Sequence, residues 1–404
     1  DDDRAGENVD AIWFDANGDG YEDLYVVNGS NEFSQASTAL LDKLYFGTAS
    51  GKLEASGQLL PLSNKFHVGS CARNVDIDGD GDQDLFIGGR LKAGLYGVPA
   101  DSHILLNDGK GNFSGAKLPK LLKLGMVTDA RWAEFDGDAG KELVVACEWG
   151  PVRILHFDGA RIVEVDTLPD GSGLWHSLAV ADFNGDGRDD IFAGNIGGNT
   201  QLNVMMDRPV ELHVNDFDGN GRAEQIVTRY AEDDKPYPIV LRDDLVKQIP
   251  ALRKTIQHYA DYQGKTLADL FSAKVLERSE IGSVETVYST VWQNDPDGWQ
   301  SNSLPLEVHL SPVYAVTVSD IDGDGDPDLI IGGNQTIAKP ELGINAASFG
   351  AILINDGHGY FTAFGPAVSG MVLDGDVRAI LPNGKSKFLV ARSNGRVTAL
   401  SIKQ

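Results

Sequence analysis

The segment from Asp76 to Asp84 has the composition of a cation-binding loop. It reads DIDGDGDQD, so carboxylates stand at its first, third and fifth positions and glycines at its fourth and sixth. The two glycines let the backbone curl, and the carboxylates can then converge on one ion; Ca²⁺ prefers about six to eight oxygens at roughly 2.3–2.6 Å. The seventh residue would contribute its main-chain carbonyl and the ninth its side chain. The segment therefore predicts a calcium site.

The residues around this loop exclude an EF-hand. An EF-hand needs a glutamate at its twelfth position and a helix on each side, whereas the twelfth residue here is Ile87. The flanking residues 72–75 and 85–87 alternate or run apolar, as strands do. The loop is therefore expected to connect two strands.

The same phrase recurs along the chain, and internal repeats of this kind are typical of propellers or solenoids. Clean copies begin at Asp15, Asp182 and Asp320, and a variant copy runs from Asp216 to Glu224. We expect about five structural Ca²⁺ ions, one in each loop. The predicted ligands, by side chain or main-chain carbonyl, are Asp15, Asn17, Asp19, Tyr21, Asp23, Asp76, Asp78, Asp80, Asp82, Asp84, Asp182, Asn184, Asp186, Arg188, Asp190, Asp216, Asp218, Asn220, Arg222, Glu224, Asp320, Asp322, Asp324, Asp326 and Asp328.

A sixth copy is weaker. It reads EFDGDAGKE, and Ala139 replaces its second glycine. Its candidate ligands are Glu134, Asp136, Asp138 and Glu142, and we expect it to bind metal more weakly or not at all. A further strand–turn–strand pattern at 377–392 has no acids in its turn.

Each repeat contains about four short strands, as one propeller blade does, with hairpin signals such as Asp108-Gly109 between apolar residues. We therefore predict an all-β, about seven-bladed β-propeller forming a single domain over 1–404. Leu245, Ile249, Leu252, Ile256 and Tyr259 fall at helical spacing, which predicts a small helical insertion at 241–280. The expected blades are 1–65, 66–122, 123–171, 172–210, 211–308 with the insertion, 309–369 and 370–404.

Composition restricts the function classes. The 404 residues carry a formal net charge of −26, so the surface repels phosphates and a nucleic-acid role is excluded. The two cysteines, Cys71 and Cys147, are interpreted as buried thiols rather than a disulfide. Weak calcium loops would stay empty in a cytosol, which favours the periplasm, the cell surface or the medium. The sequence has no membrane-spanning segment or signal peptide, and we expect a fragment whose targeting sequence or anchor lies upstream.

The loops at Asp15, Asp76, Asp182 and Asp320, each followed by a short apolar strand, resemble the FG-GAP/VCBS repeats of the integrin alpha-subunit head propeller. Such propellers serve adhesion receptors, lectins and some polysaccharide lyases, so the resemblance implies fold and metal more than function. The run 237–253, together with 311–315, is similar to the C-terminal part of large VCBS-repeat surface proteins of Bacteroidota, which are related to the cartilage-acidic-protein group. That likeness implies an exported, outer-membrane-attached lipoprotein.

Beyond calcium, we find no arrangement of residues that predicts catalysis. The eight histidines are scattered, and neither a Gly-x-Ser-x-Gly sequence nor a phosphate-binding glycine loop occurs. Four residues are candidates for binding a ligand such as a sugar ring: Trp175, His176, Trp292 and Trp299. The alternative for all four is packing in the core or across strands.

The sequence thus predicts a non-catalytic, calcium-stabilised extracellular binding or assembly module of a cell-surface protein that recognises protein or glycan. Two alternatives remain open. The first is a polysaccharide-active enzyme, lyase or hydrolase, on the same fold, which would need paired acids on one face. The second is a scaffold subunit of a larger outer-membrane protein complex.

Overall fold

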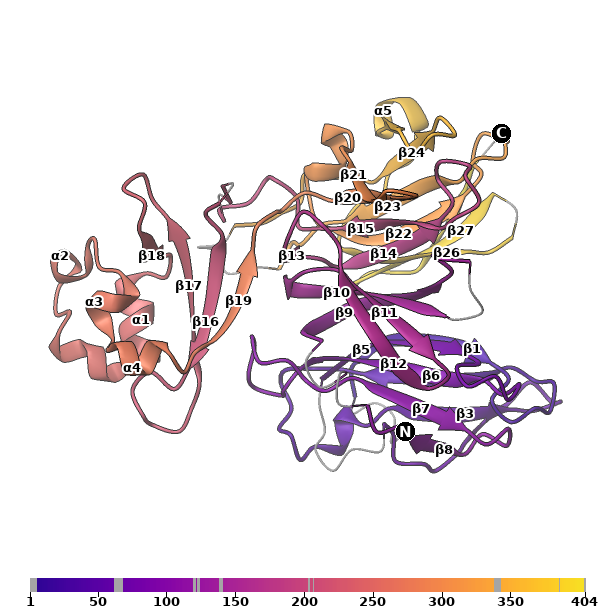
Figure 1. Cartoon of the computed structure of the whole chain (residues 1–404), viewed down its shortest axis with the longest axis horizontal. Coiled ribbons are helices and arrows are strands. Elements are labelled where there is room, and N and C mark those ends of the chain that lie inside the picture. Colours follow the sequence, from indigo (N-terminus) through magenta and orange to yellow (C-terminus); the bar gives the residue numbers. More distant parts are fainter. Residues whose placement is uncertain are drawn as a thin grey trace.

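The computed structural model describes residues 6–61, 68–118, 121, 124–137, 141–202, 204–205, 207–337, 343–384 and 386–402. They form seven antiparallel sheets, which confirms the predicted all-β class (Figure 1). In five of the seven sheets the second strand is buried on both faces, because it lies inside its own sheet and between neighbouring sheets. Asp190–Gly194, for example, is buried along its whole length. In the described part of the chain, no helix is long and apolar enough to cross a membrane.

The first three sheets follow the order of the sequence, and we call them blades 1 to 3. Blade 1 contains β1 (Asn8–Phe14), β2 (Asp23–Asn28), β3 (Lys43–Gly47) and β4 (Leu53–Ala55), with the short 3₁₀ turn η2 (Thr38–Leu40) before β3. Blade 2 contains β5 (Val68–Val75), β6 (Asp84–Leu91), β7 (His103–Asn107) and β8 (Phe113–Gly115). Blade 3 contains β9 (Met126–Ala133), β10 (Glu142–Gly150), β11 (Arg153–Asp158) and β12 (Arg161–Thr167), and β13 (Gly173–Leu174) pairs with the end of β10.

Blade 4 is assembled from two distant parts of the chain. Its inner strands are β14 (Ser177–Ala181) and β15 (Asp190–Gly194), and its outer strands are β20 (Thr290–Asp295) and β21 (Gly298–Asn302). Residues 195–289 are thus inserted between its second and third strands. The predicted fourth blade at 172–210 is therefore wrong. The prediction ended this blade soon after β15, whereas its outer strands come from beyond the insertion.

The insertion contains a sheet of its own, which we call the inserted sheet. Its strands are β16 (Val210–Asn215), β17 (Glu224–Tyr230), β18 (Pro236–Pro238) and β19 (Glu280–Val284), in the spatial order β18-β17-β16-β19. The predicted fifth blade at 211–308 is therefore also wrong, because the loop from Asp216 to Glu224 belongs to this separate sheet. The inserted sheet and its helices project from one side of the propeller (Figure 1, left).

The predicted helical segment is confirmed. It contains α1 (Arg242–Gln248), η4 (Pro250–Lys254), α2 (Tyr259–Tyr262), α3 (Leu267–Leu270) and α4 (Ala273–Leu276). The apolar positions Leu245, Ile249, Leu252 and Ile256 pack in one buried cluster with Phe217 of the inserted sheet. Thr266 and Asp269 form the capping box that their spacing predicts at the start of α3.

Two more sheets complete the propeller. Blade 5 contains β22 (Val313–Ser319), β23 (Asp328–Gly333), β24 (Ala351–Asn355) and β25 (Phe361–Phe364), preceded by η5 (Leu306–His309) and followed by α5 (Pro366–Ser369). Blade 6 contains β26 (Val377–Pro382), β27 (Lys387–Arg392) and β28 (Thr398–Ser401). The described residues thus form six radial sheets. The prediction of about seven blades counted the inserted sheet as a blade, and its last blade, 370–404, corresponds to blade 6.

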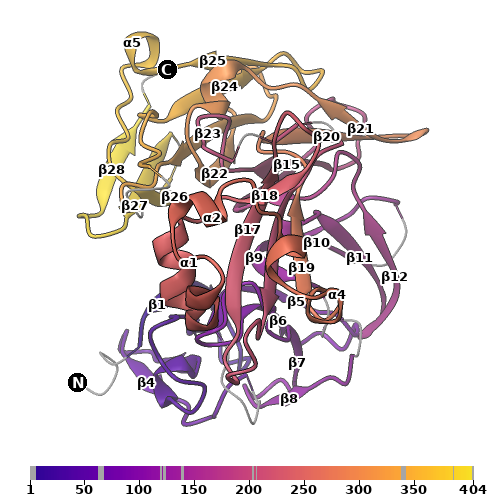
Figure 2. The same ribbon diagram turned by 90° about the vertical axis from the view of Figure 1, so that its left-hand side faces the viewer.

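The blades follow one another around a common centre, and the insertion lies in front of that centre (Figure 2). A cluster of buried apolar side chains joins each blade to the next, from blade 1 through to blade 6. Among the described residues, no such cluster joins blade 6 to blade 1. The inner strand of blade 1 accordingly leaves Val9 and Trp13 exposed, at 48% and 57%.

Candidate functional site

The predicted calcium loops connect the first strand of a blade, or of the inserted sheet, to the second. In the loop of blade 2, Gly79 and Gly81 have φ angles of +79° and +97°. These angles lie in the left-handed region, which glycine adopts without a steric penalty. The turn brings the amides of both glycines onto Asp76, whose Oδ1 and Oδ2 accept hydrogen bonds at 2.8 and 3.0 Å. The carboxylate at the first position therefore organises the loop through these two hydrogen bonds alone.

Three loops bring three carboxylates together, with one oxygen of each within 4.8 Å of the others. The groups are Asp76, Asp78 and Asp84; Asp216, Asp218 and Glu224; and Asp320, Asp322 and Asp328. Two ligands on opposite sides of one Ca²⁺ are separated by about 4.6–5.2 Å, twice the Ca–O distance. These loops therefore fit a hard divalent cation through residues one, three and nine.

The remaining predicted ligands include residues at the third and fifth positions of the loops. Asn17 and Asn184 occupy the third position of the loops at Asp15 and Asp182, and their side-chain oxygens accept hydrogen bonds from the amides of the fifth residues at 3.0 and 3.1 Å. At the fifth position, Asp80 and Asp324 are outside the groups of three, and each accepts a hydrogen bond of 3.0 Å from the amide of the seventh residue. Asp186 also pairs with the Arg188 guanidinium at 3.0 Å.

The ninth residue holds each blade loop to the sheet. Asp84 Oδ2 accepts from the Ile77 amide at 3.1 Å, and Oδ1 accepts from the Asn107 amide of the third strand at 2.8 Å. Asp23, Asp190 and Asp328 make the same two bonds. Burial raises the pKa of Asp84 to about 6, although the two amides oppose this shift. The carboxylate thus serves both as a structural acceptor and as a candidate ligand.

The sequence analysis missed a set of asparagines that joins neighbouring loops. Asn107, Asn294 and Asn355 lie at or next to the ends of the third strands of blades 2, 4 and 5. Each side-chain amide donates to the second loop residue of the preceding blade, namely Ala16, Phe135 and Phe183, at 2.8, 2.6 and 2.8 Å. The signal was available, because each asparagine precedes an aspartate in a hairpin turn.

The weak sixth loop keeps part of the pattern. Glu134 Oε1 accepts from the Gly137 amide at 2.9 Å, and Glu142 Oε2 accepts from the Phe135 amide at 3.0 Å. Asp136 and Glu142 lie in a group of potential ligands whose third member is His156 of β11, which the sequence analysis did not single out. The fourth predicted residue, Asp138, lies outside the described residues.

The tryptophans proposed as ligand-binding residues pack inside the protein instead. Trp175 and Trp292 are fully buried in the cluster between blades 3 and 4, with ring centroids 5.3 Å apart. Trp299 is half-buried and contacts the Phe135 ring edge-on at 5.2 Å. The structure thus favours the packing alternative for all three, because adjacent blades bury these rings against each other.

His176 belongs to a polar network at the opposite ends of the inner strands from the calcium loops. Its ring lies 4.3 Å from that of Tyr314, and Arg378 covers the Tyr314 ring at 4.1 Å. Its Nδ1 is 3.8 Å from Glu148 Oε1, and Arg90 pairs with the same carboxylate at 2.7 Å. Burial lowers the pKa of His176 to about 4. The imidazole is therefore neutral and enclosed, so it does not offer a ring to a sugar.

A surface cleft of about 420 Å³ lies between the calcium loop of blade 5 and the β26–β27 turn of blade 6. Its lining combines polar and apolar residues, including Ser319, Asp320, Ser386 and Phe388. Small-molecule sites commonly occupy about 300–1,000 Å³. This cleft is therefore large enough for a ligand, and it adjoins the first carboxylate of a candidate metal loop.

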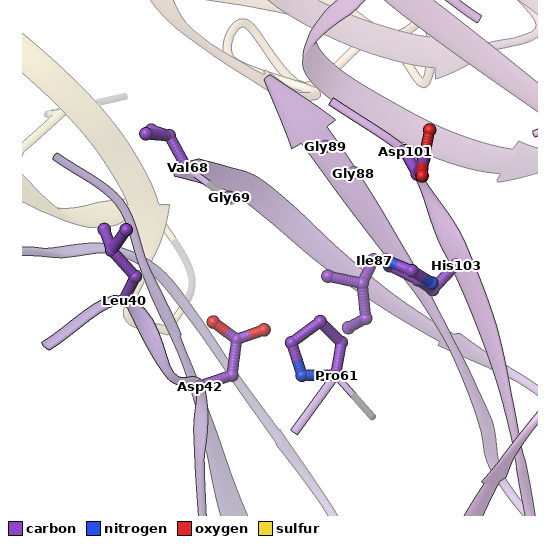
Figure 3. Close-up of a pocket in the computed structure, with 10 residues that line it drawn as sticks. All are labelled: Leu40, Asp42, Pro61, Val68, Gly69, Ile87, Gly88, Gly89, Asp101 and His103. Carbon is purple, nitrogen blue, oxygen red and sulfur yellow. The ribbon is translucent and has the colours of Figure 1, made fainter. Parts of the chain in front are cut away.

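A second cavity, between blades 1 and 2, measures about 20 Å³, which is room for one water molecule. Figure 3 shows the Asp42 carboxylate pointing into it opposite Ile87 and His103. Asp42 accepts hydrogen bonds of 2.9 Å from the Tyr25 hydroxyl and the Asn28 amide. Burial nevertheless raises the pKa of Asp42 to about 7.

Asp42 should therefore make stability depend on pH. Its pKa is higher in the folded than in the unfolded protein, so the folded state binds the extra proton between about pH 4 and 7, and wild-type stability falls as pH rises through that window. Asp42→Asn removes the charge and keeps one acceptor oxygen for the Asn28 amide, while its side-chain nitrogen can donate to the Tyr25 oxygen, as the protonated carboxyl group would. We expect its melting temperature to exceed that of the wild type by a margin that grows from pH 4 to pH 7, corresponding to about 1–4 kcal/mol. A margin that stays constant over this range would contradict the assignment.

Comparison with known families agrees with the loop geometry. Residues 15–87 and 135–193 match a family model described as an FG-GAP-like repeat, and residues 312–343 match an FG-GAP repeat. No curated protein matches the chain. The fold is thus an all-β arrangement typical of a propeller, and three of its segments match FG-GAP repeat models.

Solved structures that are similar to this chain include two crystal structures. The crystal structure of the V. cholerae biofilm matrix protein Bap1 is 11% identical, with a TM-score of 0.39 over 98% of this chain and 69% of that one. The crystal structure of BBS1N in complex with ARL6DN, soaked with lead, is 14% identical, with a TM-score of 0.35 over 98% of this chain and 91% of that one.

Proposed function

We propose that this chain is a calcium-stabilised, non-catalytic module that works outside the cell and binds a protein or glycan. The observation that carries the proposal is the repetition of carboxylate groups in FG-GAP loops. Such loops would keep the ends of the strands in place only where calcium is abundant, as it is outside the cytosol. The resemblance to Bacteroidota surface proteins supports attachment to an outer membrane.

The Ca²⁺ ions would be structural in this proposal. Asp76, Asp78 and Asp84 would hold one ion, and the corresponding residues of the other loops would hold theirs. Asp84 is also bonded to the third strand through the Asn107 amide, so an ion would fix the loop and the sheet together. The chemistry that calcium supplies here is the neutralisation of clustered like charges.

The cleft beside Asp320 is our proposed place of recognition. Its volume and mixed lining suit a saccharide or a peptide segment, and an ion in the adjoining loop would add a positive charge at its rim. Ser319 lines the cleft at the end of β22, and a larger side chain there would reduce the space without removing a carboxylate.

The test is an array of neutral and acidic glycans, probed with the whole chain in calcium and in EDTA. We expect calcium-dependent binding that Ser319→Trp abolishes and Ser301→Trp, on the exposed outer strand β21, leaves intact. A stable protein partner that co-purifies with the wild type but not with Ser319→Trp would support the assembly form of the same proposal. Turnover of a polysaccharide, or binding unaffected by Ser319→Trp, would overturn it.

A further inference from the structure

The loop of blade 3 differs from the other metal loops in its chemistry. Asp136, Glu142 and His156 each place one potential ligand atom within 4.8 Å of the others. The other three groups of this kind in the described part of the chain consist of carboxylates alone. Blade 3 therefore combines two oxygen donors with an imidazole nitrogen.

The strand pairing in blade 3 brings the carboxylate and imidazole ligands together. Glu142 on β10 and His156 on β11 stand directly opposite each other in the strand register, so their side chains are neighbours on one face. His156 Nδ1 lies 3.9 Å from Glu142 Oε1. The other ring nitrogen, Nε2, lies 3.0 Å from Asp166 Oδ2 on β12. Because Nε2 lies beside the Asp166 carboxylate, Nδ1 is the ring nitrogen that faces Glu142 and is placed to bind an ion.

The corresponding positions of other blades have no imidazole. In blades 2, 4 and 5, the residues opposite the ninth loop residue are Leu106, Gln293 and Ile354. They lie one position beyond the register pairs Leu85–Leu105, Ile191–Trp292 and Leu329–Leu353. The next residue in each is an asparagine whose amide binds the ninth carboxylate of the loop, whereas Phe157 follows His156. Glu142 Oε1 faces the imidazole instead.

We propose that Asp136, Glu142 and His156 form a site for a divalent ion of the zinc class rather than for Ca²⁺. Imidazole nitrogen suits zinc and its neighbours, whereas calcium prefers oxygen ligands alone. Ligands of a tetrahedral zinc ion lie about 3.4 Å apart, given bonds of about 2.0–2.2 Å. The observed 3.9 Å between Nδ1 and Oε1 therefore needs only a small side-chain adjustment.

Asp166 acts as a positioning residue in this site. Imidazole ligands of metals commonly donate their second N–H to a carboxylate, which fixes the tautomer and orientation of the ring. The Asp166–His156 contact has this arrangement, although it joins two adjacent strands that would pair without it. Asp136 is exposed and Glu142 is buried, so an ion would enter from the solvent side.

The experiment is a titration of the whole chain with Zn²⁺ in excess Ca²⁺, by calorimetry and, with Co²⁺ as the probe, by visible absorption. We expect one equivalent of Zn²⁺ to bind in the presence of Ca²⁺, and Co²⁺ to give the absorption of a mixed nitrogen–oxygen site. His156→Gln and Asp136→Asn should each weaken binding more than about tenfold, and Asp166→Asn by about 10–100-fold.

His213→Gln is the matched control, because His213 is also a strand histidine beside a carboxylate, with Nε2 3.1 Å from Glu211 Oε2, but belongs to no group of three potential ligands in the described residues. It should leave Zn²⁺ binding unchanged. Asp136 is exposed in the loop, so Asp136→Asn tests ligation even if His156→Gln fails to fold. Absence of Zn²⁺ binding, complete displacement of Zn²⁺ by Ca²⁺, or equal loss in His213→Gln would overturn the proposal.

Discussion

Excess EDTA is expected to lower the melting temperature of this protein by about 10–20 °C relative to the protein in millimolar calcium. A ligand present at about 100 times its dissociation constant stabilises the folded state by about 2.7 kcal/mol per site. Three loops with carboxylate triads would together contribute about 8 kcal/mol, and each kcal/mol shifts the melting temperature of a large domain by about 2 °C. The measurement is calorimetry at neutral pH.

A pair of substitutions in one loop provides the control. Asp76→Asn removes the carboxylate that accepts the Gly79 and Gly81 amides and belongs to the group of three. Asp82→Asn changes a residue of the same loop whose predicted role is carried by its main chain. In calcium, we expect Asp76→Asn to lose about 2–3 kcal/mol of stability and Asp82→Asn almost none. In EDTA the difference between the two variants should shrink to the cost of the one hydrogen bond that Asp76→Asn loses, about 0.5–1.5 kcal/mol. A wild-type melting temperature that is the same in EDTA as in calcium would contradict the structural role of the ions.

The all-β propeller and its loops could be predicted because the information lies within short segments. The segment from Asp76 to Asp84 determines where two strands end, contains two glycines with left-handed φ angles, and supplies the carboxylate that accepts the loop amides. The apolar period from Leu245 to Ile256 likewise fixes the buried face of the insertion's helices. In both cases, a local pattern is enough to specify the contact that forms.

The composition of blade 4 could not be predicted in this way. The loop from Asp216 to Glu224 repeats the pattern of the propeller loops, and Phe217 donates its amide to Glu224 as in a blade, yet it belongs to the inserted sheet. The contact that shows which strands belong to blade 4 joins residues that are far apart in the sequence. Asn294, not a residue of the insertion, donates its amide to Asp190 and thereby marks β20 as the third strand of blade 4.

The site residues that the sequence analysis missed could not be predicted for the same reason. Asn355 and His156 act through partners on other strands or blades, Phe183 for the first and Glu142 for the second. Single-sequence reasoning orders residues along the chain, whereas these contacts depend on which strands become neighbours. The ligand-binding interpretation of Trp175 failed for a related reason, since its exposure depends on whether blade 4 covers it.

Trp292→Ala is expected to lower the free energy of unfolding by about 3–5 kcal/mol, because it removes one of the two fully buried tryptophans at the junction of blades 3 and 4. The Trp292 ring packs against Trp175, and its Nε1–H donates to the Pro169 carbonyl at 3.2 Å. Trp292 lies on β20, the strand that returns to blade 4 after the insertion. Its loss would therefore weaken the attachment of the outer strands and of both ends of the insertion.

Substitutions of two further tryptophans serve as controls for this prediction. The free energy of unfolding of each variant is measured by chemical denaturation with calcium present. Trp299→Ala removes a half-buried ring from β21 and should cost less, while Trp13→Ala removes a ring that is 57% exposed and should change stability by about 0.5 kcal/mol or less. This order follows burial alone. A Trp292→Ala loss no larger than that of Trp13→Ala, combined with lost glycan binding, would instead assign Trp292 the ligand-binding role that its sequence context first suggested.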